Sequence, residues 1–171
     1  MLDKTTYGAH LYPKAHCEVT SDAPSGLDRL LAIEQIKRTK AFYCFSMDTK
    51  DWDGYQNVFS ADAVLEVPSH GLGDPAARVE GAAAIRRHVE DAVGHVVTTH
   101  ECHTPIIDFT SATTANVVWA MEDMLRFPEG APVKTLHGMG HYFEQYRCGA
   151  DGSWRLAYVR LERLRLEVER A

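Results

Sequence analysis

The sequence pattern of the second half of the chain predicts a series of long β-strands, and this pattern limits the fold more than any other feature. Apolar residues alternate there over long stretches, and each stretch ends at residues typical of turns. Long strands joined by short turns pair antiparallel, and their apolar face needs a second layer to cover it. The predicted strands span residues 98–109, 114–127, 133–147 and 153–168.

Helical signals in the first half of the chain supply that second layer. Ser25-Gly26-Leu27-Asp28 matches a capping box, and apolar residues then follow helical spacing to about Asp48. Thr49 or Asp51 can cap a short second helix, and a third helix is predicted at 82–92. These helices are expected to pack against one face of the predicted sheet.

The remaining segments complete the predicted fold. A turn is predicted at 60–62, a strand at 63–67 and a loop at 69–77. Residues 1–24 are polar and lack periodicity, so we expect a tail or an arm there. Residues 25–171 are then one α+β domain, with three N-terminal helices on a strongly curved, mostly antiparallel sheet that leaves an apolar cavity.

Composition and charge narrow the class of protein. The chain has 171 residues, 45% hydrophobic and 25% charged, which suits one globular domain. Its net charge of -6 argues against a nucleic-acid partner, and the basic residues of 155–170 are interpreted as the solvated face of a strand. No run approaches the roughly 18 apolar residues of a membrane span. The amino terminus lacks a secretory signal, so we expect a cytoplasmic protein with no membrane partner.

No motif indicates a metal or a cofactor. The four cysteines form no C-x-x-C pair, so we expect reduced, buried thiols, although Cys44 and Cys102 lie close enough in sequence to Asp48 and His100 to line one pocket. His100-Glu101-Cys102-His103 is one residue too short for a metalloprotease motif. Two further histidines, His137 and His141, would lie about 13 Å apart on a strand face, too far to share one ion. Glycine-rich phosphate and dinucleotide loops are absent from the sequence.

One carboxylate and one imidazole on largely apolar elements form the first candidate site. Asp48 lies at the end of the predicted first helix, and His100 lies near the start of the first long strand. A carboxylate that orients an imidazole makes a general base, because it fixes the tautomer and stabilises the imidazolium. Each residue alone is more often structural, and the spacing does not show whether the fold brings the two together.

A second carboxylate interrupts the strand predicted at 114–127. Its odd-numbered positions are apolar except for Asp123, so Asp123 points into the apolar side, where an unpaired carboxylate is costly. The structural alternatives are an aspartate satisfied by hydrogen bonds or a bulge that turns it outward. Gly138 and Gly140 lie inside the next strand, where small residues make room for a ligand or a bend.

Several short motifs point to a known family. They are Tyr43-x4-Asp48 with Asp51-Trp52, Phe59-Ser60-Ala61-Asp62-Ala63, Glu80-Gly81, Thr99-His100, Gly140-His141-Tyr142 with Tyr146, and Asp151-Gly152-Ser153-Trp154-Arg155. With them the chain resembles the SnoaL-like branch of the NTF2-like superfamily of cone-shaped α+β barrels. The branch includes bile acid 7α-dehydratase, scytalone dehydratase and hexachlorocyclohexane dehydrochlorinase. The motifs indicate fold and branch rather than reaction, because the superfamily holds dehydratases, isomerases, hydrolases, cyclases and non-catalytic binders.

The resemblance implies roles for four residues. Asp48 and His100 fall on the catalytic pair shared by the dehydrochlorinase and the bile acid dehydratase. Tyr43 and Asp123 fall on a further tyrosine and aspartate of the latter. The implied activity is a cofactor-independent lyase of dehydratase type that acts on a hydrophobic, hydroxylated small molecule such as a steroid, terpenoid or polyketide. His100 would remove a proton, while Tyr43 and a protonated Asp123 would position the substrate oxygen.

Two alternative functions fit the same residues. An isomerase of the ketosteroid-isomerase type would use the same base without loss of water, and a non-catalytic binder would bind apolar ligands without turnover. The resemblance also implies a homo-oligomer, either a dimer or a trimer. His141 has the opposite strand parity to its neighbours, so we expect it outside the pocket. The residues expected to line the pocket are Trp52, Trp119, Met121, Gly138, Gly140, Tyr142 and Val159.

Overall fold

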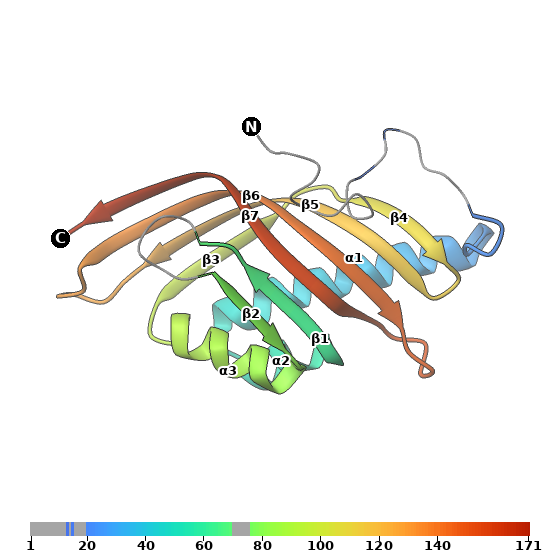
Figure 1. Cartoon of the computed structure of the whole chain (residues 1–171), viewed down its shortest axis with the longest axis horizontal. Coiled ribbons are helices and arrows are strands. Elements are labelled where there is room, and N and C mark those ends of the chain that lie inside the picture. The colour runs from blue at the N-terminus through green and yellow to red at the C-terminus, as the bar shows by residue number, and fades with distance from the viewer. Residues whose placement is uncertain (1–12, 14, 16–19, 70–75) are drawn as a thin grey trace.

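A computed structural model of the protein describes residues 13, 15, 20–69 and 76–171 (Figure 1). The prediction of a tail at 1–24 therefore falls largely outside the described residues. The helices are α1 (Gly26–Thr49), α2 (Trp52–Asn57) and α3 (Ala82–Val93). The strands are β1 (Phe59–Val67), β2 (Ala77–Glu80), β3 (Val97–Cys102), β4 (Ile106–Ser111), β5 (Thr114–Arg126), β6 (Val133–Cys148) and β7 (Trp154–Arg170).

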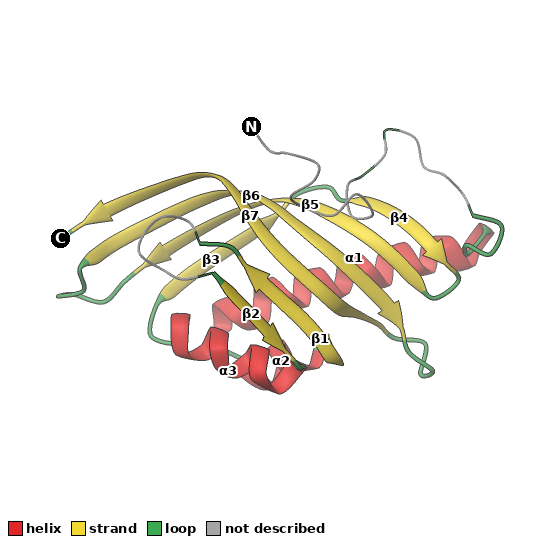
Figure 2. Cartoon of the chain, in the orientation of Figure 1, coloured by secondary structure: helices red, strands yellow, loops and turns green. Residues whose placement is uncertain are grey.

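The strands form one mixed sheet in the order β2-β1-β7-β6-β5-β3, and β4 also pairs with β5. Neighbouring strands are antiparallel, except for the parallel pair of β1 and β7. The helices gather on the lower side of the sheet in the view of Figure 2. Helix α1 contacts β3 and β7, α3 contacts β1 and β2, and α2 contacts both other helices. The α+β class and the mostly antiparallel sheet are confirmed; the strong curvature of the sheet stays a prediction.

Three strand predictions were wrong in detail. The single strand predicted at 98–109 is two strands, because Pro105 lacks the N–H that a continuous ladder requires. Strand β1 begins at Phe59, so the predicted turn at 60–62 is strand, with a register shift relative to β7 between Phe59 and Val64. Residues 77–80 form β2, where the loop prediction had reached residue 77.

The helix boundaries follow the capping signals more closely. Helix α1 begins directly after Ser25, although the Ser25 side chain makes no capping hydrogen bond. Of the two candidate caps for α2, Asp51 is the one used, because its Oδ1 accepts a hydrogen bond from the backbone N–H of Gly54 at 2.9 Å. Lys50 joins the two helices in the left-handed conformation, with φ of 62°.

Aromatic rings fill much of the core between the helices and the sheet. Tyr43 of α1 contacts Tyr55, Phe59 and Tyr142, with ring centroids 5.1, 6.0 and 5.8 Å apart. Tilted and edge-on arrangements at these separations are favourable because of the ring quadrupoles. None of the helices in the described part of the chain has the length and apolarity that a membrane crossing requires.

Candidate active site

Asp48 and His100 are in direct contact. His100 Nδ1 lies 2.7 Å from Asp48 Oδ1, and the backbone N–H of His100 donates to Asp48 Oδ2 at 2.9 Å. Thr98 Oγ1 donates a third hydrogen bond to Asp48 Oδ1 at 2.9 Å. Because an ionised carboxylate can only accept, Nδ1 of a neutral His100 carries the hydrogen and Nε2 keeps its lone pair. This arrangement can remove a proton through Nε2.

Two neighbouring elements place this pair. Asp48 lies in the last turn of α1, which packs against β3, the strand that carries Thr98 and His100. The left-handed conformation of Lys50 ends the helix, and Lys50 Nζ donates to Thr98 Oγ1 at 3.0 Å. A chain of hydrogen bonds thus runs from Lys50 through Thr98 to Asp48. It holds the carboxylate in one orientation toward the imidazole.

The hydrogen bonds also decide the charge on Asp48. Burial acts to raise the pKa of Asp48, but hydrogen bonds from the ring and backbone of His100 and from Thr98 outweigh it, so the pKa lies below its usual value of 3.8. Burial lowers the pKa of Lys50, while the nearby Asp48 charge partly offsets that effect. Asp48 is therefore a carboxylate at neutral pH, as an orienting partner of a base should be.

The lowered pKa of Asp48 predicts how an Asp48→Asn variant responds to acid. The pKa of such a carboxyl group is lower in the folded protein than in the unfolded chain. Its ionised form therefore stabilises the fold at any pH above the unfolded pKa, and this stabilisation is lost as the pH falls through the folded pKa. We expect the variant to unfold more easily than the wild type, by a constant amount above about pH 5, with the difference shrinking in more acidic solution. Urea unfolding at a series of pH values measures this difference. A difference independent of pH throughout would contradict the assigned charge.

A cavity of about 320 Å³ is lined by several of the candidate side chains. Helices α1 and α3 and the strands opposite them enclose it, and most of its wall is apolar. Four predicted residues share this wall: Tyr43, His100, Asp123 and Tyr142. The rest of its described lining is Met47, Leu65, Val67, His88, Val89, Ala92, Val93, Leu125, Leu136, Leu161, Arg163 and Leu166. Three of the four predicted catalytic side chains thus face one void, and the fourth, Asp48, lies behind His100.

Most residues predicted to line the pocket lie elsewhere. Trp119, Met121 and Val159 have the predicted inward direction but are packed in the core, at 4%, 3% and 0% exposure. Trp52 packs edge-on against Tyr55, with ring centroids 6.0 Å apart. Strand parity predicted correctly which side of the sheet these side chains face. It could not show at which positions along each strand the helices leave a cavity.

Asp123 is buried, as its parity predicts, but it has a charged partner that its own strand does not indicate. Arg163 Nη2 donates to Asp123 Oδ2, and Asp123 is only 1% exposed. Asp123 and Arg163 thus form a buried ion pair. The other carboxylate oxygen, Oδ1, and Arg163 Nε have no hydrogen-bond partner among the described residues. Both atoms are buried beside Gly138.

Arg163 could have been found from strand parity. It has the same parity on β7 as Val159 and Leu161, which are both buried. The interpretation of 155–170 as a solvated face was wrong at this position. The register with β6 pairs Gly140 with Arg163 and Met139 with Arg165, so Leu164 is an extra residue in a bulge. The bulge reverses the parity of β7 only after Arg163, so Leu166 faces the cavity side although its number is even.

Gly138 and Gly140 make room for this part of β7. A Cβ on Gly140 would overlap the backbone of Glu162 and Arg163. A Cβ on Gly138 would lie 2.5 Å from Arg163 Nε and closer still to Asp123 Oδ1. The two glycines, which were predicted to contact the substrate, instead allow the bulge and the Asp123–Arg163 pair to approach β6.

This crowding predicts the effect of Gly138→Ala. The added methyl group must displace Asp123 or Arg163, and a shift of about 1 Å in a catalytic group can reduce turnover by about 10²-fold. Overpacking of this kind also costs about 1–3 kcal/mol of stability. Met139→Ala on the opposite face of β6 is the matched control and should keep its turnover. Equal turnover in the two variants, measured by steady-state kinetics, would show that the ion pair does not act in the reaction.

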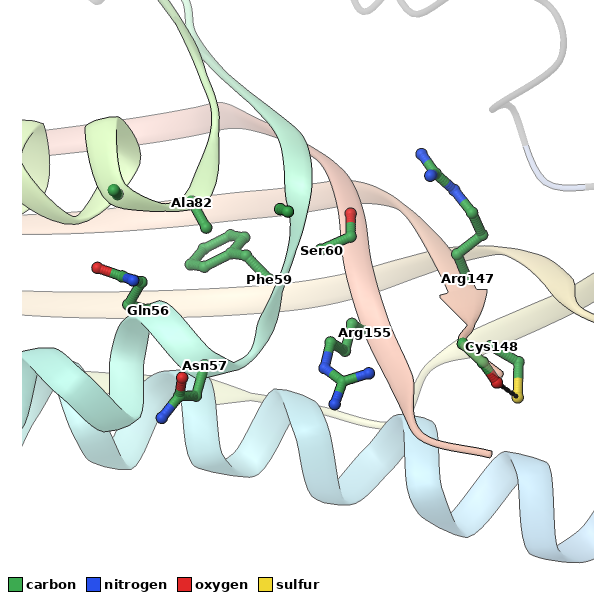
Figure 3. A pocket seen from close by; sticks show the side chains of 11 residues that line it. Gln56, Asn57, Phe59, Ser60, Ala82, Arg147, Cys148 and Arg155 are labelled. Atoms are coloured by element: carbon green, nitrogen blue, oxygen red, sulfur yellow. Dashed lines mark hydrogen bonds between the residues drawn. The ribbon is translucent and has the colours of Figure 1, made fainter. Parts of the chain in front are cut away.

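A larger cavity, of about 650 Å³, has a different set of lining residues (Figure 3). It opens between α2, the start of α3 and the ends of β6 and β7, and none of the predicted site residues lines it. Its arginines already have partners: Arg147 pairs with Asp62 at 3.0 Å, and Arg155 pairs with Asp151 at 2.7 Å. The smaller cavity is therefore the better candidate for the active site, because it alone of the two holds an oriented base.

The position of His141 agrees with its strand parity. His141 lies on the outer face of the sheet beside Phe143, with ring centroids 6.2 Å apart, and burial lowers its pKa. Among residues 20–69 and 76–171, no cluster of three or more His, Cys, Asp or Glu side chains could hold a metal ion.

The fold and the cavity define an NTF2-like α+β protein. The model of the SnoaL-like domain family matches residues 28–160, and the chain belongs to this family. The resemblance seen in the sequence motifs is thereby confirmed.

Solved structures share the fold at low sequence identity. A hexachlorocyclohexane dehydrochlorinase of type 3 from Novosphingobium barchaimii superposes with a TM-score of 0.71 at 18% identity, covering 85% of this chain and 94% of the other. A proposed scytalone dehydratase from Novosphingobium aromaticivorans gives 0.69 at 22% identity, covering 84% and 91%. A proposed aromatic ring hydroxylase from the same organism gives 0.68 at 21% identity, covering 86% and 96%. The named reactions differ, so these matches show the fold alone.

Proposed function

We propose that the protein is a cofactor-independent lyase that removes water from a hydrophobic, hydroxylated small molecule. The observation that carries this proposal is the 2.7 Å contact between His100 Nδ1 and Asp48 in the wall of an apolar cavity. The contact leaves Nε2 as a base, and the cavity volume of about 320 Å³ suits one small ligand. Two solved relatives in fold are named for related eliminations, a dehydratase and a dehydrochlorinase, which supports the same class of reaction.

The reaction needs one proton to move. His100 Nε2 takes a proton from a carbon next to a carbonyl group, and the resulting carbanion expels the hydroxyl group from the neighbouring carbon as the C–O bond breaks. The imidazolium then returns the proton to the departing oxygen, so that one water leaves and His100 ends unchanged. Burial raises the pKa of Tyr43, so its phenol keeps its proton and can donate a hydrogen bond to a substrate oxygen.

Asp123 and Arg163 are proposed to hold a second polar group of the substrate. Both side chains line the cavity, where a substrate hydroxyl group can donate to the Asp123 carboxylate and accept from the Arg163 guanidinium. The substrate would then be a largely apolar skeleton with polar groups at separate positions, as in a steroid, terpenoid or polyketide.

Product mass tests this function against its alternative. Purified protein is incubated with a panel of hydroxylated steroid, terpenoid and polyketide ketones, and the products are analysed by mass spectrometry. A product lighter by one water supports the lyase. A product of unchanged mass with a moved double bond supports an isomerase that uses the same base. A third outcome is tight binding of panel members without any product, with the binding unaffected by His100→Ala. This outcome would contradict both the lyase and the isomerase and would indicate a ligand-binding protein.

A further inference from the structure

A second contact between α1 and β3 lies one helical turn below the Asp48–His100 pair. Cys44 Sγ and Cys102 Sγ are 3.7 Å apart, although the residues are separated by 58 positions in the sequence. Cys44 precedes Asp48 by four residues on α1, and Cys102 follows His100 by two residues on β3, so each cysteine shares the face of its neighbour. The two thiols are therefore held together by the same helix–strand packing that builds the candidate base.

We propose that Cys44 and Cys102 are a redox modification site, at which a hydroperoxide converts the two thiols into a reversible intramolecular disulfide. The sulfurs of a disulfide are bonded at about 2.05 Å, so they must approach one another by about 1.7 Å. The cysteines lie on two elements that pack by side chains rather than by a hydrogen-bonded ladder, so a small shift of α1 can supply this movement. The inference does not depend on the proposed reaction of the cavity.

The chemistry balances with the peroxide as the oxidant. The Cys102 thiolate attacks one peroxide oxygen, the O–O bond breaks, and the sulfur becomes a sulfenic acid while the other oxygen leaves as water or an alcohol. Cys44 then attacks the sulfenic sulfur, a sulfur–sulfur bond forms, and the hydroxyl group leaves as water. The two thiols lose two electrons and two protons in total, and the peroxide is reduced by the same two electrons.

The surroundings of the two cysteines indicate which thiol attacks the peroxide and which one resolves the sulfenic acid. Cys44 is only 8% exposed, whereas Cys102 is partly exposed and can meet a small oxidant. The hydrogen bond between the thiols, followed by the nearby positive charge of Lys40, lowers the pKa of Cys102, although burial opposes this. The same hydrogen bond, together with burial, raises the pKa of Cys44. Cys102 is thus the attacking thiolate and Cys44 the resolving thiol.

The experiment uses the full chain with Cys17→Ser and Cys148→Ser, so that only this pair of thiols remains. The protein is treated with hydrogen peroxide, the free thiols are alkylated, and the intact mass and peptides are measured. We expect loss of both alkylation sites, an intact mass about 2 Da below that of the reduced protein before alkylation, as for loss of two hydrogens, and one peptide that joins the two cysteines. Dithiothreitol should reverse all three changes. The oxidised protein should also unfold at a higher temperature, because the crosslink restricts the unfolded chain.

Single variants separate the roles. With Cys44→Ser added, peroxide should leave a sulfenic acid on Cys102 that dimedone traps, without any crosslink. With Cys102→Ser added, Cys44 should stay unmodified under the same conditions. The proposal is overturned if both cysteines oxidise separately, if crosslinks form only between chains, or if neither thiol reacts in a protein whose circular dichroism matches the wild type.

Discussion

Replacing His100 with alanine should reduce the rate of the proposed dehydration by about 10²–10⁴-fold, the usual contribution of a general base. The His100 side chain is only 7% exposed, but it lies at the cavity wall, and its loss removes Nε2 while the helix–strand packing of α1 on β3 remains. Steady-state kinetics measure the loss, and circular dichroism with thermal unfolding should show that the variant is folded.

Two other histidines serve as controls for this result. His141→Ala removes the same side chain from the outer face of the sheet and should keep wild-type turnover. His88→Ala removes a histidine that lines the same cavity but pairs with no carboxylate among residues 20–69 and 76–171, and it should affect substrate binding more than the rate of the chemical step. If His100→Ala retained turnover while His88→Ala lost it, the base would be His88.

The second large effect is expected on stability, from Lys40. Its Nζ lies 2.6 Å from Glu144 Oε1, with the two side chains 1% and 0% exposed. Burial acts to lower the pKa of Lys40, but Glu144 and the neighbouring Cys102 and Cys44 outweigh it, so the pKa is raised and the pair is ionic. Lys40→Met leaves a buried carboxylate whose remaining bond is from Tyr146 Oη, at 2.8 Å. We expect a loss of about 3–5 kcal/mol in the free energy of unfolding.

The same helix provides the matched control. Lys37 pairs with Glu34 at 2.6 Å, but the two side chains are 44% and 69% exposed. Lys37→Met should therefore cost no more than about 1 kcal/mol in denaturant unfolding. Combining Lys40→Met with Glu144→Gln should recover much of the loss, because a neutral amide can still accept the hydrogen bond from Tyr146. Equal costs for the Lys37 and Lys40 variants would contradict the buried ion pair.

The Lys40–Glu144 pair also shows what periodicity can reveal. Lys40 follows Ile36 by four residues and precedes Tyr43 by three, so helical spacing places it on the buried face. Glu144 has the strand parity of Tyr142 and Tyr146, which are both buried. The same parity argument placed Asp123 correctly. Charged residues at inward positions were thus visible in the sequence, but their partners depend on tertiary packing.

Other parts of the fold depend on contacts that no local pattern encodes. The bulge at Leu164 reverses the parity of β7 after Arg163 and hides the inward position of Leu166. The four residues of β2 are too few for a periodic signal, and they are strand because they pair with β1. The contact of Asp48 with His100 was predicted from a resemblance, and the packing of α1 on β3 brings it about. The oligomeric state, a dimer or a trimer, stays a prediction.

The most direct test of the account is the tautomer of His100, measured by ¹⁵N NMR of the imidazole at a pH where the ring is neutral. We expect hydrogen on Nδ1 and a lone pair on Nε2, because Asp48 Oδ1 lies 2.7 Å from Nδ1 and can only accept. Asp48→Asn should weaken this preference, since an amide can also donate. A wild-type spectrum with hydrogen on Nε2 would contradict the account, because the nitrogen that faces the cavity would then have no lone pair to accept a proton.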